Sequence, residues 1–181
     1  MRLFPYFAGG LLFSLGVVAP ARAQEARRPP ATAMSQPLTS AVRAHALRLS
    51  PGQDLRQELQ AYAQAHGLHA AAVVTGVGSL TTVALRLANQ SGAATRHGHF
   101  EIVSLVGTVS VNGSHLHLAV ADSTGQTFGG HLLDGCRIYT TAEIVLSELP
   151  ELEFTRAPDP VTTYQELRIE RATKFAKPAK P

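Results

Sequence analysis

A hairpin signal followed by two closely spaced histidines constrains this chain most strongly. Asn112-Gly113 is a dipeptide typical of tight turns between antiparallel strands, and the run from His115 to Val120 alternates polar and apolar residues as a half-buried strand does. Residues i and i+2 of a strand lie on the same face, so His115 and His117 present their imidazoles together. The pattern predicts a hairpin whose second strand carries two candidate metal ligands.

A third histidine follows the next predicted turn. Asp122-Ser123-Thr124-Gly125 is expected to reverse the chain, and Gly129-Gly130 has no side chains that would keep His131 away from the pair. Three imidazoles suit zinc or a similar divalent ion and leave a fourth position open for water or a ligand. The alternative interpretation is two polar side chains on the wet face of a strand and an unrelated loop histidine.

The N-terminal segment has the order of features found in secretory signal peptides. Arg2 precedes an apolar stretch from Leu3 to Val18, and Ala21-Arg22-Ala23 is a small-x-small cleavage pattern. We therefore expect residues 1–23 to be a signal peptide, residues 24–39 to be a linker, and the mature protein to be periplasmic or secreted without a membrane span. Translation from Met34 is the alternative, and it would leave the protein in the cytoplasm.

The distribution of charge argues against a nucleic-acid partner. The whole chain has a formal net charge of +3, but residues 35–170 contain eight Arg, no Lys and twelve Asp or Glu, which gives −4. The basic surplus lies in the N-terminal segment and in residues 171–181, which we expect to be a disordered tail. A folded nucleic-acid surface needs clustered cations to displace phosphate counterions. We therefore do not expect nucleic acid as a partner.

Short strands joined by turns dominate the rest of the chain. A helix is predicted with Ser50 as its cap, Pro51 as its first residue, Gln53 in a capping box and Gly67 at its end. Strands are predicted at 42–49, 70–75, 82–89, 99–105, 108–111, 138–146 and 163–169, in addition to the hairpin strand that begins at His115. This order predicts an α/β (α+β) fold, with one domain built from a mainly antiparallel sheet and a packed helix.

Other chemistry-bearing residues support weaker predictions. Cys136 is the single cysteine, so no intramolecular disulfide forms, and we interpret it as a small buried side chain rather than a nucleophile. Glu143 lies on an otherwise apolar strand and needs a partner. It could orient a metal-bound histidine or act as a general base, but a structural hydrogen bond is favoured over catalysis. Gly76-Val77-Gly78-Ser79 lacks the later glycine and the helix of a dinucleotide site, so we interpret it as a turn.

Four segments carry a resemblance to a known family. These are Gly98–Leu105, Gly113–His117, Gly129–Leu132 and Thr140–Leu146. In this order they resemble the plants-and-prokaryotes conserved (PPC) domain, over about residues 40–170. The resemblance implies a compact α/β fold and a homotrimer. It also implies that His115, His117 and His131 correspond to histidines that bind a metal in some stand-alone bacterial and archaeal members.

The resemblance does not bring an established reaction, and the plant pattern is incomplete here. In plants this domain accompanies AT-hook motifs, but Arg27-Arg28-Pro29-Pro30 lacks the glycine of the Gly-Arg-Pro core that enters the minor groove. We expect an exported homotrimer that binds a divalent metal, zinc first, and has a candidate small-molecule ligand. The alternative is a self-associating interaction module, or a DNA-binding protein by family association. The sequence leaves open whether the protein is an enzyme.

Overall fold

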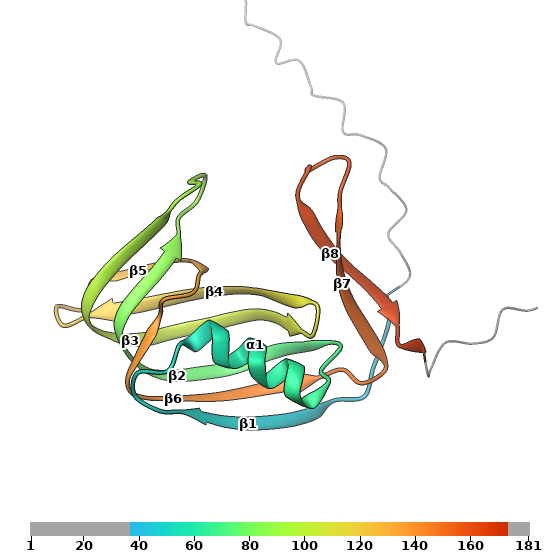
Figure 1. The fold of residues 1–181 in the computed structure, drawn as a ribbon, viewed down its shortest axis with the longest axis horizontal. Coiled ribbons are helices and arrows are strands. Elements are labelled where there is room, and N and C mark those ends of the chain that lie inside the picture. The colour runs from blue at the N-terminus through green and yellow to red at the C-terminus, as the bar shows by residue number, and fades with distance from the viewer. Residues whose placement is uncertain (1–36, 174–181) are drawn as a thin grey trace, which may run out of the picture. The chain divides into compact units, whose positions relative to one another are not determined.

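Antiparallel strand pairing accounts for most of the architecture in the computed structural model, which describes residues 37–173. The predicted signal peptide, the linker up to residue 36 and residues 174–181 of the predicted tail lie outside the described residues. Six strands form one sheet in the order β1 (Arg43–Leu49), β6 (Arg137–Glu148), β2 (Ala71–Arg86), β3 (Ala93–Ser110), β4 (Gly113–Asp122) and β5 (Thr127–Leu132) (Figure 1). A separate hairpin contains β7 (Leu152–Pro158) and β8 (Gln165–Arg171).

The end of β2 pairs with two strands, and this closes part of the sheet on itself. Arg86 lies opposite Ala93 of β3 and also opposite His131 of β5. Because β3, β4 and β5 pair in succession, the four strands β2 to β5 form a closed ring of hydrogen-bonded neighbours. This closure brings Arg86 to the strand that carries His131.

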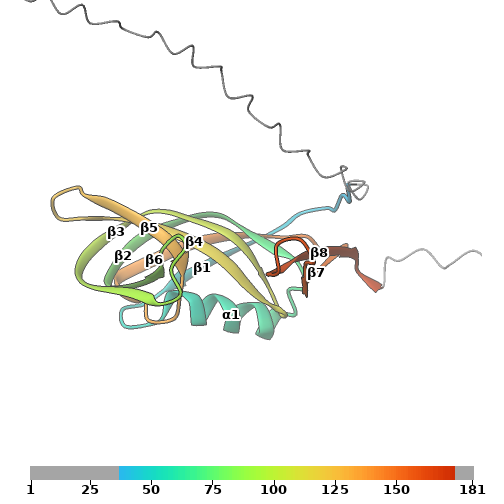
Figure 2. The same cartoon turned by 90° about the horizontal axis from the view of Figure 1, so that it is seen from above.

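One helix, α1 (Leu55–His66), lies along a face of the six-stranded sheet (Figure 2). Its residues Leu55, Leu59 and Ala63 are fully buried and belong to the same apolar cluster as Leu80 and Ile144 of the sheet. Burial of each leucine side chain contributes roughly 1.5 to 3 kcal/mol. The predicted α+β class with a mainly antiparallel sheet is confirmed. None of the helical structure in the described part of the chain has the length and apolar character needed to cross a membrane.

The helix begins later than the sequence predicts. Asp54 is the N-cap, since its carboxylate accepts from the backbone N–H groups of Arg56 and Gln57, both at 3.1 Å. Ser50 and Gln53 do contact each other, with the Gln53 amide oxygen accepting from the Ser50 N–H at 2.6 Å, but they form a turn before the helix. The Asp54 carboxylate also accepts from the Gly135 N–H at 2.6 Å, and this tertiary bond fixes the cap at Asp54.

The helix end and the turns of the hairpins agree with the predictions. Gly67 closes α1 in the left-handed conformation, with φ of 62°. Val111-Asn112 joins β3 to β4, so Asn112 lies in the predicted turn while Gly113 is the first residue of β4. The Asp122 carboxylate accepts from the Thr124 N–H at 2.8 Å in the turn before β5.

Two glycine-containing segments that the sequence pattern places between strands lie inside long strands. Gly76-Val77-Gly78-Ser79 is part of β2, so the predicted strands 70–75 and 82–89 are one strand; likewise β3 joins 99–105 and 108–111. A Cβ on Gly78 would lie 2.1 Å from the Thr141 carbonyl oxygen, and one on Gly107 would lie 2.0 Å from that of His115. Here glycine permits close approach of the neighbouring strand, not a turn.

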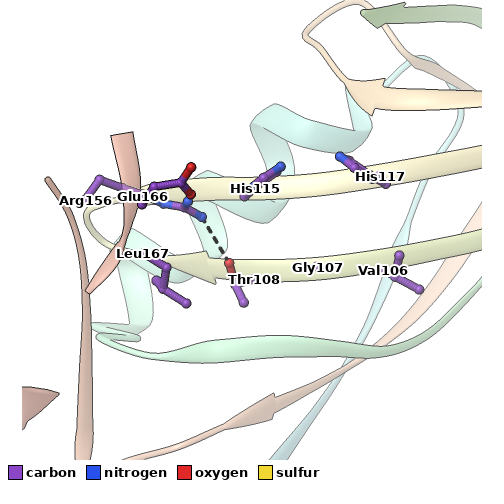
Figure 3. A pocket seen from close by; sticks show the side chains of 8 residues that line it. All are labelled: Val106, Gly107, Thr108, His115, His117, Arg156, Glu166 and Leu167. Atoms are coloured by element: carbon purple, nitrogen blue, oxygen red, sulfur yellow. Dashed lines mark hydrogen bonds between the residues drawn. The ribbon is translucent and has the colours of Figure 1, made fainter. Parts of the chain in front are cut away.

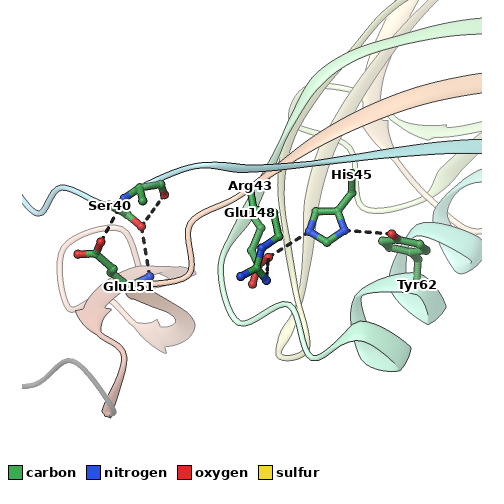
Figure 4. A network of polar contacts seen from close by, with 7 residues as sticks. Ser40, Arg43, His45, Tyr62, Glu148 and Glu151 are labelled. Carbon is green, nitrogen blue, oxygen red and sulfur yellow. Dashed lines mark hydrogen bonds and ion pairs between the residues drawn. The ribbon is translucent and has the colours of Figure 1, made fainter.

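A polar network ties the sheet edge to the helix (Figure 4). The His45 ring on β1 lies 3.0 Å from the Tyr62 hydroxyl of α1 and 3.1 Å from the Glu148 carboxylate of β6. Arg43 donates to the same Glu148 oxygen at 3.0 Å. Because the Glu148 side chain is only 11% exposed, these partners compensate a carboxylate that would otherwise be costly to bury.

The β7–β8 hairpin lies against the turn between β3 and β4. The Phe154 carbonyl accepts from the Asn112 side-chain amide at 2.9 Å and from the Ser110 hydroxyl at 3.3 Å. Arg156 donates to the Thr108 hydroxyl at 3.4 Å. The sequence predicts only the second strand of this hairpin, at 163–169. That strand is β8, and it extends to Arg171, the first residue of the predicted tail.

Candidate metal centre

Three histidines converge where β4 pairs with β5. His115 and His117 share one face of β4, and His131 of β5 lies directly opposite His117 in the strand register. One ligand nitrogen from each of the three rings lies within 4.8 Å of the other two. The ring centroids are 5.0 to 5.7 Å apart. The β4–β5 pairing therefore brings the three predicted ligands into one cluster.

The glycines before His131 allow β5 to fit between its neighbours. A Cβ on Gly129 would lie 2.8 Å from the Leu118 carbonyl oxygen of β4, and one on Gly130 would lie 2.8 Å from the Arg86 carbonyl oxygen of β2. Real Cβ atoms do not approach backbone oxygens this closely, so larger residues would push β5 away. The Gly-Gly pair thus brings His131 to the other histidines, although it does so within a strand and not within a loop.

The surroundings of the rings favour their neutral forms. The pKa of His131 is lowered to about 4, chiefly by burial and next by the positive charge of Arg86. The pKa of His115 is also lowered, chiefly by burial and next by the charge of Arg156, while the charge of Glu166 partly opposes the shift. The neutral imidazole is the form that binds a metal ion, so these two rings are available as ligands at neutral pH.

One ring nitrogen of the cluster lacks a hydrogen-bond partner. Nδ1 of His131 is buried and has no hydrogen-bond partner among the described residues. A buried polar atom without a partner costs about 1 to 3 kcal/mol. A divalent ion bound through this nitrogen would give it a partner, and three imidazoles are a donor set that zinc accepts.

Two cavities adjoin the cluster. The first, of about 310 Å³, lies beside His115 and His117 and is bordered by Val106, Arg156 and Glu166 (Figure 3). The second, of about 570 Å³, lies beside His115 and His131. The second cavity is also lined by Arg56, Arg86, Arg156, Tyr164 and Glu166. Ligands from solvent therefore have space next to the histidines, and arginines border that space.

Glu143 is not brought to this cluster. It is exposed on β6, opposite Arg48 of β1 and Val77 of β2, and it lines neither cavity beside the histidines. Because the carboxylate is exposed, it does not require the buried partner that the apolar strand pattern suggests.

Cys136 is buried, as the sequence predicts. Its thiol accepts from the Ala84 N–H at 3.2 Å and donates to the Ala84 carbonyl at 3.4 Å. Burial raises the pKa of Cys136 to about 11, which suppresses the reactive thiolate.

The arginines around the site are the residues that sequence reasoning missed. Arg86 comes from β2 and reaches the site only because β2 pairs with β5. Arg156 and Glu166 come from the β7–β8 hairpin, whose contact with β3 is tertiary. The sequence indicates that Arg86 lies in the predicted strand 82–89. No local sequence pattern indicates that this strand pairs with β5.

The comparisons with known proteins agree on the family. The sequence profile described as "Plants and Prokaryotes Conserved (PCC) domain", the family abbreviated PPC above, matches residues 37–150. The bifunctional protein GlmU of Synechococcus sp. strain JA-3-3Ab is 50% identical over 145 residues, which cover 80% of this chain and 23% of that protein. AT-hook motif nuclear-localized protein 27 of Arabidopsis thaliana is 32% identical over 109 residues, which cover 52% of this chain and 35% of that protein. The chain thus spans a minor part of both relatives.

Solved structures share the fold. A hypothetical protein from Salmonella enterica is 46% identical with a TM-score of 0.73, covering 74% of this chain and 97% of that one. A metal-containing protein from Archaeoglobus fulgidus is 23% identical with a TM-score of 0.63, covering 73% and 98%. A candidate DNA-binding protein from Bacteroides thetaiotaomicron is 22% identical with a TM-score of 0.61, covering 74% and 100%. Because the family profile matches residues 37–150, more than half of the sequence, the chain belongs to the plants and prokaryotes conserved domain family.

Proposed function

We propose that the mature protein is an exported homotrimer that binds one divalent metal ion per subunit, zinc first, through His115, His117 and His131. The observation that carries the proposal is the approach of three ligand nitrogens to within 4.8 Å of one another. Three neutral imidazoles are a ligand set that zinc accepts while it keeps one position open. When bound, such an ion would supply a Lewis acid, held by histidines that line the two cavities. The metal-containing relative from Archaeoglobus fulgidus supports this proposal.

Zinc binding is tested by calorimetric titration of protein that has been stripped with a chelator. We expect one zinc per subunit for wild-type protein and its loss in the His115→Ala, His117→Ala double variant. His66→Ala is the matched control, because His66 lies on α1 outside the cluster and should leave the stoichiometry unchanged. Stoichiometric zinc retained by the double variant would contradict the assignment.

The trimer is supported by exposed valines on two neighbouring strands. Val74 and Val77 of β2 are 63% and 53% exposed, and Val103 and Val106 of β3 are 56% and 52% exposed. β2 and β3 pair directly on both sides of these valines, at Ala72 with Thr108 and at Ser79 with Glu101. Exposed apolar side chains on neighbouring strands are typical of an interface between copies of a chain.

Light scattering tests the assembly. We expect about three subunits for wild-type protein and smaller species for Val103→Lys. The control is Val161→Lys, because Val161 is 82% exposed in the turn between β7 and β8. A wild-type monomer at micromolar concentration, or equal effects of both substitutions, would refute the interface.

Export is tested on natively expressed protein by fractionation and mass spectrometry. Cleavage after Ala23 predicts a periplasmic or secreted product that begins at Gln24. A cytoplasmic product that begins at Met34 would show that export is wrong.

DNA binding is the second candidate function, because the names of some similar proteins point to it. The candidate DNA-binding protein from Bacteroides thetaiotaomicron and the AT-hook protein from Arabidopsis thaliana weaken the expectation that nucleic acid is not a partner. The charge of −4 over residues 35–170 favours the metal-site proposal instead. Titration with duplex DNA at about 50 mM and about 200 mM salt tests this second candidate, since phosphate contacts would make the affinity fall steeply as the salt concentration rises.

A further inference from the structure

Positive charge gathers in the larger cavity beside the histidines. Arg56, Arg86 and Arg156 line this cavity, and Glu166 is the one acidic residue among its lining residues. The arginines come from α1, β2 and β7, three elements that are distant in sequence. A cavity with this charge balance attracts an anion, and a divalent ion held by neutral histidines would add to that attraction.

The three arginines differ in how far they are already engaged. Arg56 forms an ion pair with Asp134, and Arg156 donates to the Thr108 hydroxyl at 3.4 Å and to the Gln165 carbonyl at 3.5 Å. The Arg86 guanidinium makes no hydrogen bond or ion pair with any other residue within 37–173, although Arg86 lies opposite His131. Arg86 therefore has its full set of donors available at the edge of the histidine cluster.

We propose that this cavity binds a small molecule through an oxyanion group, a phosphate or a carboxylate, which Arg86 and Arg156 hold next to His115 and His131. The proposal deepens the proposed function and rests on it for the role of the metal. Guanidinium groups match both oxyanions through paired hydrogen bonds. A volume of about 570 Å³ is within the range of small-molecule sites.

The β7–β8 hairpin gives this chain part of the proposed site. It contributes Arg156, Tyr164 and Glu166, all of which lie beyond the residues 37–150 that match the family profile. Arg156 is half-buried and fixed by its contact with Thr108, so it is positioned before a ligand arrives. Glu166 sits beside it as an acceptor for a hydroxyl or amine elsewhere on the ligand.

The charge of Arg86 predicts opposite effects on the metal and on the anion. A guanidinium near the histidines repels a divalent ion but attracts an oxyanion. Arg86→Ala should therefore raise zinc affinity, measured without added anion, by roughly twofold to fivefold. The same change should weaken oxyanion binding about tenfold or more. A structural role for Arg86 would lower both affinities.

The test is calorimetry with inorganic phosphate in one arm and acetate in the other. Wild-type protein is loaded with one equivalent of zinc, dialysed free of excess metal, and compared with Arg86→Ala and Arg156→Ala. Arg48→Ala is the control, because Arg48 on β1 binds Thr141 and lines neither histidine cavity. Circular dichroism verifies that each variant is folded. We expect saturable oxyanion binding that both cavity variants weaken and the control retains; the tighter arm identifies phosphate or carboxylate.

Two results would overturn the inference. The first is zinc-loaded wild-type protein that binds neither anion, and the second is anion binding that Arg86→Ala leaves unchanged. Protein that binds no zinc would instead refute the proposed function. In that case, phosphate binding to zinc-free protein that depends on Arg86 and Arg156 would still support the anion site.

Discussion

Acid should destabilise the metal-free protein between about pH 6.5 and pH 4 through His131. The pKa of this ring is about 4 in the folded protein and near 6.5 as a free side chain. Between these values the unfolded chain binds a proton that the folded protein does not, so the free energy of unfolding falls as the pH falls. The difference corresponds to at most about 3 kcal/mol. Because the ring is partly exposed and solvent screens it, we expect about 1 to 2 kcal/mol.

Urea unfolding in the presence of a chelator measures this effect. We expect the free energy of unfolding of His131→Gln to depend less on pH than that of wild-type protein, by about 1 to 2 kcal/mol over the window. His131→Ala should show the same weaker dependence if the ring itself is responsible. Asp122 and Asp159 act outside this window: hydrogen bonds with Thr124 and Thr162 lower their pKa below 3.8. Equal pH dependence of wild-type and variant proteins would refute the assigned environment of His131.

Three further predictions follow from the fold. Gly107→Ala should destabilise the protein by roughly 2 to 4 kcal/mol, measured by urea unfolding, because its Cβ would lie 2.0 Å from the His115 carbonyl oxygen and its φ is +133°; an unchanged midpoint would contradict this close approach. Asp54→Ala should cost about 2 to 4 kcal/mol in the same assay, since the helix cap and the Gly135 N–H both lose their acceptor, and Asp54→Asn should cost less. Cys136 should react with a thiol reagent at about pH 8 only after unfolding, because its pKa is about 11; rapid labelling of folded protein would contradict its burial.

Local patterns predict the parts of the site that one hairpin supplies. The i, i+2 spacing of His115 and His117 is a property of a single strand, and the turns on either side of it have clear sequence signals. The position of His131 depends on how β5 pairs, and only the Gly-Gly pair hints at it. Arg86 and Arg156 reach the site through strand pairings between distant segments, and these pairings leave no periodic pattern.

The errors in the predicted elements have physical causes. A glycine inside a strand and a glycine in a turn look alike in sequence, so the sequence pattern divides β2 and β3 at glycines that accommodate a neighbouring backbone. Ser50 and Asp54 are both good caps, and the bond from Gly135 to Asp54 decides between them. Glu143 lies on an apolar strand whose outer face is exposed, so the strand pattern overstated its burial.

Anomalous diffraction at the zinc absorption edge tests the central claim most directly. Crystals grown from protein loaded with one equivalent of zinc per subunit should show one anomalous peak per subunit at the histidine cluster. That peak should lie about 2.0 to 2.1 Å from one nitrogen each of His115, His117 and His131. A peak at another position, or no peak at the cluster in crystals of zinc-loaded protein, would contradict the metal centre.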